Sequence, residues 1–233
     1  MASSPEILNN LQRRVEGLGL TWLGVADLGP EPDFARYIKW IHEKRHAGMG
    51  YLESNLEIRR DPRALLPGAK SVILVALGYY LGDKLRPRRN DEPPRIAQYA
   101  RLRDYHRELR KRAETVARDI REHHDNAMVG TRVVVDSAPI LERALAARAG
   151  GGFIGKNTCF ISPNFGSWLL LAEILSTVAL PASSGPEVDA SKRSEVGGCG
   201  TCRRCQVYCP TGALDHAYSL DANRCIAYWT IEH

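Results

Sequence analysis

Residues 71–80 read SVILVALGYY, an uninterrupted apolar run that is rich in β-branched and aromatic side chains. A second run of this kind, TRVVVD, covers residues 131–136. Strands that are apolar at every position are buried on both faces, so these runs predict a sheet covered by helices on both sides. A short strand is also expected at residues 21–26 (TWLGVA), and residues 165–174 contain a further candidate.

Helical patterns alternate with these strands. We expect helices at residues 4–17, 33–47, 101–124 and 139–149, where apolar positions recur on one face or charged residues dominate between breaks. Strands that alternate with helices predict an α/β core over residues 1–180, and an α+β arrangement is the alternative.

The composition is that of an ordinary folded protein. The chain has 233 residues, of which 44% are hydrophobic and 25% are charged, and this balance argues against disorder. The apolar runs are far shorter than the ~20 residues that cross a bilayer. The first ten residues, MASSPEILNN, lack the basic and apolar regions of a secretory signal. We therefore expect a cytoplasmic protein that has no membrane partner.

The cysteines are concentrated near the C-terminus, beyond a stretch at residues 181–198 whose Pro, Ser, Gly and charged residues predict a linker. Residues 199–210 read CGTCRRCQVYCP, the pattern C-x2-C-x2-C-x3-C-P. Three cysteines at this spacing bind three corners of a [4Fe-4S] cube, and the cysteine before proline typically binds a second cluster. A zinc site is the alternative, but it would favour two C-x2-C pairs separated by a longer loop. The expected ligands are Cys199, Cys202 and Cys205 for one cluster, and Cys209 and Cys225 for the other.

The number of thiolates raises a question about the extent of the chain. Two cubane clusters need eight thiolates, and the module at residues 199–233 offers five. We therefore expect a fragment of a longer protein, with unusual ligands as the alternative. Cys159 stands apart from the module and is expected to be a small buried apolar side chain.

Several stretches resemble the epoxyqueuosine reductases, which are cobalamin-dependent iron–sulfur enzymes that complete queuosine synthesis in tRNA. The tract from Asp136 to Thr158, followed by the cysteine motif, is the most specific part of the resemblance. The family continues into a second cysteine motif, C-x2-C-x3-C-P, which this sequence does not contain. The matching stretches are residues 61–73, 95–106, 135–158, 165–174, 199–214 and 221–232.

The resemblance implies a fold, a reaction and a set of site residues. It implies a mixed-sheet, cobalamin-binding domain followed by a ferredoxin-type module, in a monomer that acts on the wobble position of tRNA. Electrons from an external donor would pass through the clusters to cobalt, which attacks the epoxide, and Asp136 would be the proton donor. The positions that match the corrin contacts of the family are Arg59, Ala97, Asp136, Lys156 and Asn157.

The residue chemistry around Asp136 is compatible with this role. Asp136 follows an apolar strand, and ligands of open α/β sheets bind at the ends of strands. Contact with a large apolar corrin would desolvate the carboxyl and raise its pKa toward the range of a general acid. The alternative is that Asp136 caps the helix expected to begin near Pro139.

The glycine-rich segment at residues 150–157 ends in Lys156 and Asn157. A nucleotide-binding P-loop is disfavoured because Asn157 stands where that loop requires Ser or Thr. The pair is compatible with a contact to the tail of a corrin, and a tight turn after a helix is the alternative.

Residues 84–112 carry eleven basic and four acidic side chains, a net charge of +7, whereas the whole chain carries +5. Such a stretch suits the phosphates of tRNA, and Tyr99 and Tyr105 within it are candidates for stacking on an unpaired base. A solvated arginine-rich helix is the alternative.

Three other functions compete with the reductase. The sequence His42-Glu-Lys-Arg-His46 matches a zinc-peptidase pattern by letter, but its many charged residues indicate a solvated helical face. A reductive dehalogenase of the same cobalamin and iron–sulfur type is one remaining alternative. A non-catalytic electron-transfer or RNA-binding protein is the other, and it would not need to bind a corrin.

Overall fold

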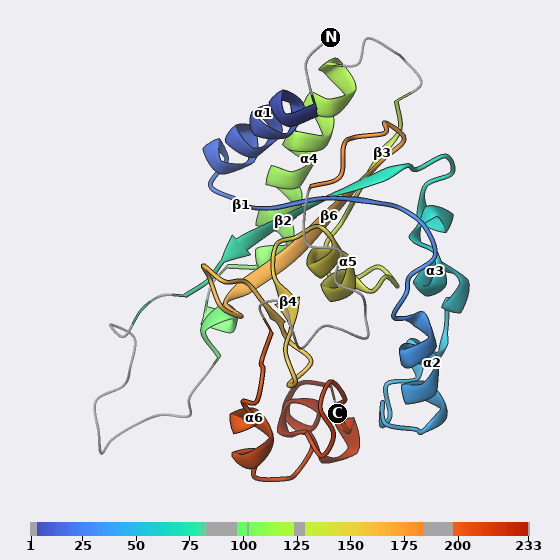
Figure 1. Cartoon of the computed structure of the whole chain (residues 1–233), viewed down its shortest axis with the longest axis vertical. Coiled ribbons are helices and arrows are strands. Elements are labelled where there is room, and N and C mark those ends of the chain that lie inside the picture. The colour runs from blue at the N-terminus through green and yellow to red at the C-terminus, as the bar shows by residue number, and fades with distance from the viewer. Residues whose placement is uncertain are drawn as a thin grey trace.

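The computed structural model describes residues 4–80, 82, 97–101, 103–123, 129–183 and 198–232. Its centre is a four-stranded sheet with the strand order β1-β2-β6-β3 (Figure 1). Neighbouring strands in this sheet are antiparallel throughout. The strands are β1 (Thr21–Asp27), β2 (Ser71–Gly78), β3 (Thr131–Val134) and β6 (Leu169–Ser176).

The strand directions correct the sequence expectation. Because β6 pairs antiparallel with both β2 and β3, those two strands run parallel to each other without being neighbours. The connection between them contains the helix α4 (Tyr105–His123), so β2, α4 and β3 form a split βαβ unit. The expected mixed sheet is therefore wrong, and the α+β alternative describes the strand pairing.

Helices cover both faces of the sheet, as the apolar run at residues 71–80 predicts. The helices α1 (Ser4–Gly17) and α4 pack on one face, and α5 (Glu142–Arg148) packs on the other (Figure 1). Ile73 points into the first layer and Leu74 into the second, and both side chains are fully buried. Full burial of each such side chain stabilises the fold by about 1.5–3 kcal/mol.

A chain of short helices connects β1 to β2 along one side of the sheet. It comprises α2 (Phe34–His42), η1 (Gly50–Glu53), α3 (Leu56–Arg60) and η2 (Pro62–Leu65). The helix expected at residues 33–47 ends at His42, and Lys44 and Ala47 beyond it have left-handed φ angles of 54° and 53°. The short 3-10 helix η4 (Gln98–Arg101) precedes α4. Sequence reasoning missed the small hairpin of β4 (Phe153–Ile154) and β5 (Phe160–Ile161).

The C-terminal module, residues 198–232, contains α6 (Arg204–Val207), η5 (Ala222–Arg224) and the π-helical turn η6 (Tyr228–Glu232). Most of the expected linker, residues 184–197, lies outside the described residues. The described residue Ser183 extends the sheet edge, since its backbone N–H donates to the Val25 carbonyl at 2.8 Å. Among the described helices, none has the length and apolarity that a membrane span requires.

Candidate active site

A cavity of about 260 Å³ opens where the sheet, α4 and α5 meet. Its floor is apolar because the first residues of β6 line it, while Tyr105 and Asp136 contribute polar groups from two other segments. The complete lining consists of Tyr105, Asp136, Glu142, Arg143, Cys159, Phe160, Ser167, Leu169, Leu170 and Leu171.

Asp136 is held in this wall by two neighbours from the start of α4. His106 Nε2 lies 3.0 Å from Asp136 Oδ2, and the Tyr105 hydroxyl donates to the same oxygen at 3.4 Å. The backbone of Asp136 is left-handed, with a φ of 57°, which is uncommon for a residue other than glycine. Two hydrogen bonds and an unusual backbone conformation therefore fix the direction of this carboxyl.

Of the two surroundings considered for Asp136 from sequence, the structure excludes the helix cap. The helix α5 begins at Glu142, and its N-cap position is Leu141, so Asp136 does not cap it. The Asp136 side chain is 61% exposed in this structure, and its desolvation by a corrin stays a prediction. Burial applies instead to two glutamates behind it.

Glu142 and Glu173 form a buried carboxyl pair beside Asp136. Burial raises the pKa of Glu142 to about 7, and the negative charge of Asp136 contributes to the shift. Glu173 is fully buried in β6, and neither of its carboxyl oxygens has a hydrogen-bond partner among the described residues. Burial raises the pKa of Glu173 well above its ordinary value of 4.5, with further contributions from Glu142 and Asp136. Both carboxyls therefore favour the protonated form more than an exposed glutamate does.

The opposite wall of the cavity faces the C-terminal module. Cys159 lies in this wall, and burial raises the pKa of its thiol, with a smaller contribution from Cys205. The cysteine loop lies close to this wall, since Lys156, three residues before Cys159, donates to the carbonyls of Gly200 and Cys202. Arg143, which also lines the cavity, donates from Nη1 to the carbonyl of Thr158 at 2.5 Å and so fixes the segment before Cys159. Cys159 thus lines a cavity, whereas the sequence predicted only a small buried side chain in the core.

Of the five expected corrin contacts, only Asp136 lines the cavity. Arg59 is buried, and its guanidinium donates to the carbonyls of Ser54 at 3.3 Å and Tyr51 at 3.4 Å. Ala97 is exposed, and its carbonyl accepts the N–H of Ala100 at 3.0 Å.

Lys156 and Asn157 contact their own chain. The ammonium of Lys156 donates to the carbonyls of Gly200 at 2.6 Å and Cys202 at 2.9 Å, and its backbone N–H lies 3.4 Å from the sulfur of Cys199. Asn157 Oδ1 accepts the N–H of Cys159 at 3.2 Å. Lys156 therefore fixes the cysteine loop against the sheet domain in this structure.

The donor set of the module fits iron. All of its cysteines are free thiols. The Thr211 hydroxyl and the backbone N–H groups of residues 211, 213 and 214 lower the pKa of Cys209 to about 7, which favours the thiolate that binds iron. Among the described residues, no three His, Cys, Asp or Glu side chains gather closely enough to hold a single metal ion. The fit to a cluster therefore rests on the chemistry and spacing of the thiols.

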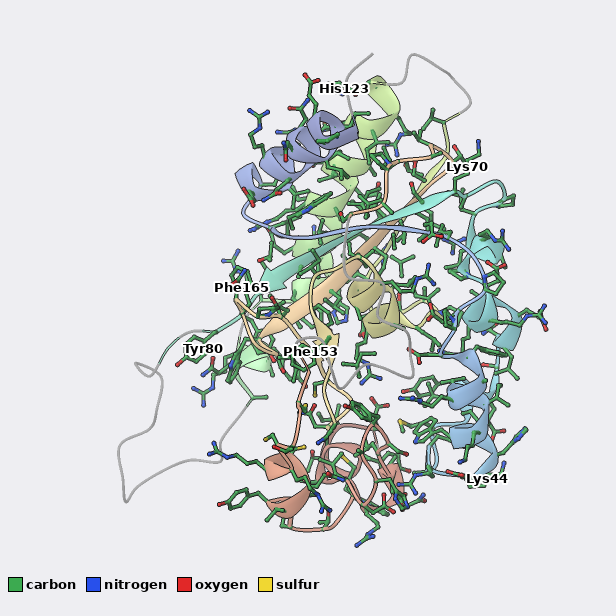
Figure 2. All side chains as sticks on the ribbon, in the orientation of Figure 1. Lys44, Lys70, Tyr80, His123, Phe153 and Phe165 are labelled. Atoms are coloured by element: carbon green, nitrogen blue, oxygen red, sulfur yellow. The ribbon has the colours of Figure 1, made fainter. Side chains whose placement is uncertain are left out.

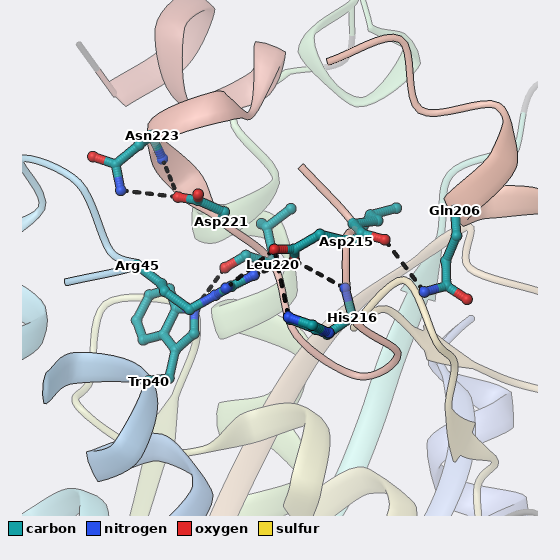
Figure 3. A network of polar contacts seen from close by, with 9 residues as sticks. Trp40, Arg45, Gln206, Asp215, His216, Leu220, Asp221 and Asn223 are labelled. Atoms are coloured by element: carbon teal, nitrogen blue, oxygen red, sulfur yellow. Dashed lines mark hydrogen bonds and ion pairs between the residues drawn. The ribbon is translucent and has the colours of Figure 1, made fainter. Parts of the chain in front are cut away.

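Figure 3 shows the polar network that joins the module to α2. Arg45 forms an ion pair with Asp215, and its carbonyl accepts the N–H of Ala222 at 2.7 Å. Trp40 Nε1 donates to the Leu220 carbonyl at 2.6 Å.

This network corrects the expectation for residues 42–46. The helix ends at His42, and His46 is buried with Nε2 2.8 Å from Glu53, so the two histidines do not form the helical pair of a zinc peptidase. A solvated face was also the wrong prediction for Arg45 and His46.

Aromatic side chains gather at one end of β2. The ring of Trp168 lies 5.4 Å from that of Tyr79 and 5.1 Å from that of Tyr80, and Tyr99 contacts both Tyr79 and Tyr105 edge-on. Figure 2 places Tyr80 and Phe165 at this end of the molecule, with Lys70 at the other end of the strand. This aromatic cluster adjoins the cavity through Tyr105.

The expected basic stretch is described only in part. Residues 83–96 and 102 lie outside the described residues. Within α4, Arg110 donates to the Val133 carbonyl, and Arg112 donates to the carbonyls of Leu18 and Gly19. These two arginines are therefore engaged in the fold.

Sequence reasoning missed three polar residues of the site. Glu173 carried a signal, since it is the only charged residue in the apolar run LLLAEILS at residues 169–176. His106 and Glu142 lie within stretches that resemble the reductases, but neither spacing nor composition indicated their roles.

Comparisons with known proteins show which family the chain resembles. A family model described as epoxyqueuosine reductase QueG, DUF1730, matches residues 59–137, and a 4Fe-4S double cluster binding domain matches residues 198–233. A curated epoxyqueuosine reductase of Synechococcus sp. is 40% identical over 200 residues, which cover 84% of this chain and 56% of the relative.

Two solved structures show the same fold at 26% identity. One is an epoxyqueuosine reductase with an epoxyqueuosine-modified tRNA stem loop, with a TM-score of 0.73, matched over 97% of this chain and 57% of that chain. The other is the Bacillus subtilis epoxyqueuosine reductase with its catalytic aspartate loop swung out of the active site, with a TM-score of 0.71 over the same shares. The chain spans just over half the length of the relatives that it matches. On these matches, the chain belongs to the epoxyqueuosine reductase family.

Proposed function

We propose that this protein reduces epoxyqueuosine to queuosine at the wobble position of tRNA, with Asp136 as the proton donor. The observation that carries the proposal is the position of Asp136 in the wall of a cavity whose opposite wall, at Cys159, lies near the cysteine module. One relative of known structure has a catalytic aspartate loop that swings out of its active site, and another is bound to a modified tRNA stem loop, which supports the same assignment here.

Two kinds of cofactor are part of the proposal. Residues 199–233 would hold [4Fe-4S] clusters through Cys199, Cys202 and Cys205 for one cluster and Cys209 and Cys225 for the other. Residues 1–180 would bind cobalamin, which supplies a strongly nucleophilic reduced metal next to the substrate. The apolar floor formed by Leu169, Leu170 and Leu171 suits the reacting face of such a cofactor.

The other expected corrin contacts differ in how well they fit. Arg59 and Lys156 would reach the cofactor only after giving up their hydrogen bonds to backbone carbonyls. Ala97 offers a backbone or methyl contact, and Asn157 lies next to the cavity residue Cys159. Asp136 is therefore the strongest of the proposed contacts.

The residues of this chain have defined tasks in the reaction. Removal of the epoxide oxygen as water takes up two electrons and two protons, and an alkoxide without a proton is a poor leaving group. Asp136 donates to that oxygen, while Tyr105 orients its carboxyl. The aromatic cluster at the end of β2 offers surfaces on which an unpaired base stacks. We further propose that the protein acts as a monomer in the cytoplasm and receives electrons from an external donor.

The experiment that tests the proton donor is Asp136→Asn in the full-length enzyme with clusters and cobalamin. A positioned acid contributes about 10²- to 10⁴-fold in rate, so turnover should fall by that factor while bound iron, corrin and thermal midpoint stay unchanged. The matched control is Asp27→Asn, which changes an exposed aspartate at the end of β1. Turnover of Asp136→Asn close to that of the wild type would remove the acid from the mechanism.

Binding of tRNA is tested separately through its dependence on salt. Replacement of Arg103 and Arg107 by Glu should flatten the log–log slope of affinity against salt by about 0.7–0.9 for each phosphate that is no longer bound. An unchanged slope would place the tRNA on another surface.

A further inference from the structure

We propose that His106 returns protons to Asp136, and that Asp104 is a positioning residue that holds the imidazole for this transfer. This inference rests on the proposed reaction, in which each turnover takes up two protons. Asp136 carries one proton at a time, so it must be reprotonated within the site before the oxygen leaves as water. His106 is the group in direct contact with the Asp136 oxygen that is able to do this.

The three side chains form a continuous path. Asp104 Oδ1 lies 2.8 Å from His106 Nδ1, and His106 Nε2 lies 3.0 Å from Asp136 Oδ2. Both distances are within the range of a hydrogen bond. Asp104 is the most exposed of the three, whereas Asp136 lines the cavity. The His106 side chain is itself 43% exposed, so the imidazole is open to solvent while its Nε2 faces the carboxyl that lines the cavity.

Local structure fixes the imidazole in this orientation. The carboxylate of Asp104 accepts the backbone N–H of His106 at 3.1 Å, so the first turn of α4 holds both residues together. The Tyr105 ring stacks on the imidazole with a centroid separation of 3.9 Å and an angle of 26° between the planes. The ring nitrogens are thus directed at two carboxylates by the fold of α4 itself.

The charges around His106 favour its protonated form. Asp104 and Tyr105 face it from its own segment, Asp136 faces it from the loop after β3, and Glu142 faces it from α5. The hydrogen bond that His106 donates to Asp136, followed by the one that it donates to Asp104, raises the pKa of His106 above its ordinary value of 6.5. A histidine of this kind holds a proton near neutral pH and is still acidic enough to release it.

The bonds, electrons and protons of the proposed reaction balance. Both C–O bonds of the epoxide break, the carbons become a double bond, and the two electrons come from the clusters and the cobalamin. Asp136 gives its proton to the oxygen, and His106 Nε2 passes its proton to Asp136 Oδ2. His106 is then neutral with its remaining proton on Nδ1 beside Asp104, and it takes up a solvent proton at Nε2 before a second passage through Asp136 completes the water.

The first test measures the pKa of His106 by NMR titration of its ring signals in this chain, without any turnover. Asp104→Asn and Asp136→Asn should each lower that pKa, and His123→Gln, a change at an exposed histidine near the other end of α4, should leave it unchanged. A His106 pKa that neither Asp variant changes would overturn the path, whatever the activity of the enzyme.

The second test is His106→Gln in the full-length enzyme with its cofactors. Glutamine retains a hydrogen-bonding group but carries no transferable proton, so steady-state turnover should fall by about 10-fold or more at unchanged corrin and iron content. In His106→Ala, added imidazoles should restore turnover in an order that follows their pKa values. Rescue that is independent of imidazole pKa would indicate a purely structural role and overturn the proposal.

The outcomes separate this inference from the proposed function. If Asp136→Asn loses turnover while His106→Gln keeps it, the proposed reaction and the role of Asp136 as the acid would stand. The proton transfer from His106 would be rejected. Full turnover in Asp136→Asn would reject the acid itself, and the NMR result would still report whether the three side chains are coupled.

Discussion

The sheet domain and the C-terminal module are stabilised by different means. In the sheet, side chains such as Ile73, Leu74 and Ile174 are fully buried between helices on both faces. Within the described part of the module, Ala213 and Ala222 are the buried residues, while Tyr208 and Trp229 are 80% and 55% exposed. Burial of apolar surface stabilises the sheet, whereas the module depends on its thiol ligands and on polar contacts to α2.

The largest effect on stability is expected from a substitution that leaves an empty space in the core of the sheet domain. Ile174→Ala removes a fully buried side chain from the central strand β6 and should lower the free energy of unfolding by about 2–5 kcal/mol. Ile231→Ala, at an exposed position of the module, is the control and should change it little. Denaturant unfolding measured by far-UV circular dichroism checks both, and equal effects would mean that the two regions do not differ as described.

The buried glutamate should make the sheet sensitive to pH. Because the folded-state pKa of Glu173 is raised above 4.5, its contribution to stability is present below that pH and is lost as the pH rises toward the folded-state pKa. The loss amounts to about 1.4 kcal/mol per pH unit in that window. Glu173→Gln should therefore gain stability relative to the wild type as the pH rises above 4.5, and Glu57→Gln, on the exposed side of α3, should not.

A smaller and more local effect is expected at the contact between the two regions. Arg45→Gln leaves Asp215 without its ion-pair partner, and loss of a partly buried charged hydrogen bond costs about 1–3 kcal/mol. Amide hydrogen exchange should rise in residues 198–232 and stay unchanged in β2 and β6. Lys39→Ala, at an exposed position of α2, is the matched control. Faster exchange in the sheet would show that the two regions unfold as one unit.

The smallest effects on stability are expected from two aspartates, one in each region, that cap short helices in the same way. Asp61 accepts the N–H of Arg63 at the start of η2, and Asp221 accepts the N–H of Asn223 at the start of η5. Loss of either cap by substitution with Ala should cost about 1 kcal/mol. The Asp61 change should appear in the thermal transition of the sheet domain, and the Asp221 change should appear in the rate of iron loss to a chelator. The reverse assignment would contradict the division between the regions.

The elements of the sheet domain were largely predictable, but their pairing was not. The apolar runs at residues 21–26, 71–80 and 131–136 correspond to β1, β2 and β3, and the helix expected at residues 4–17 is α1 with the same bounds. Periodicity reports whether a strand is buried, and it contains no information about which strand lies beside it. The insertion of β6 between β2 and β3 therefore could not be derived from these patterns.

In the candidate site, sequence could predict only those residues whose type and place along the chain both point to a role. Asp136 follows its strand and lies in the cavity wall as expected. The resemblance implies a corrin contact for Lys156, which stays a prediction, whereas its hydrogen bonds to the carbonyls of the cysteine loop could not be foreseen from sequence. His106 and Glu142 meet Asp136 only through the packing of α4 and α5 on one sheet, which is a tertiary contact that neither segment encodes by itself.

The position of β6 between β2 and β3 also determines when the sheet can form during synthesis on the ribosome. Residues 71–78 and 131–134 are synthesised first, and neither strand has its central neighbour until residue 176 has been made. Up to that point the apolar faces of the nascent chain have no complete sheet on which to close, so they are a natural substrate for chaperones. Because the cysteine loop follows β6 by only 23 residues, counted from Ser176 to Cys199, iron delivery would come at nearly the same time as closure of the core.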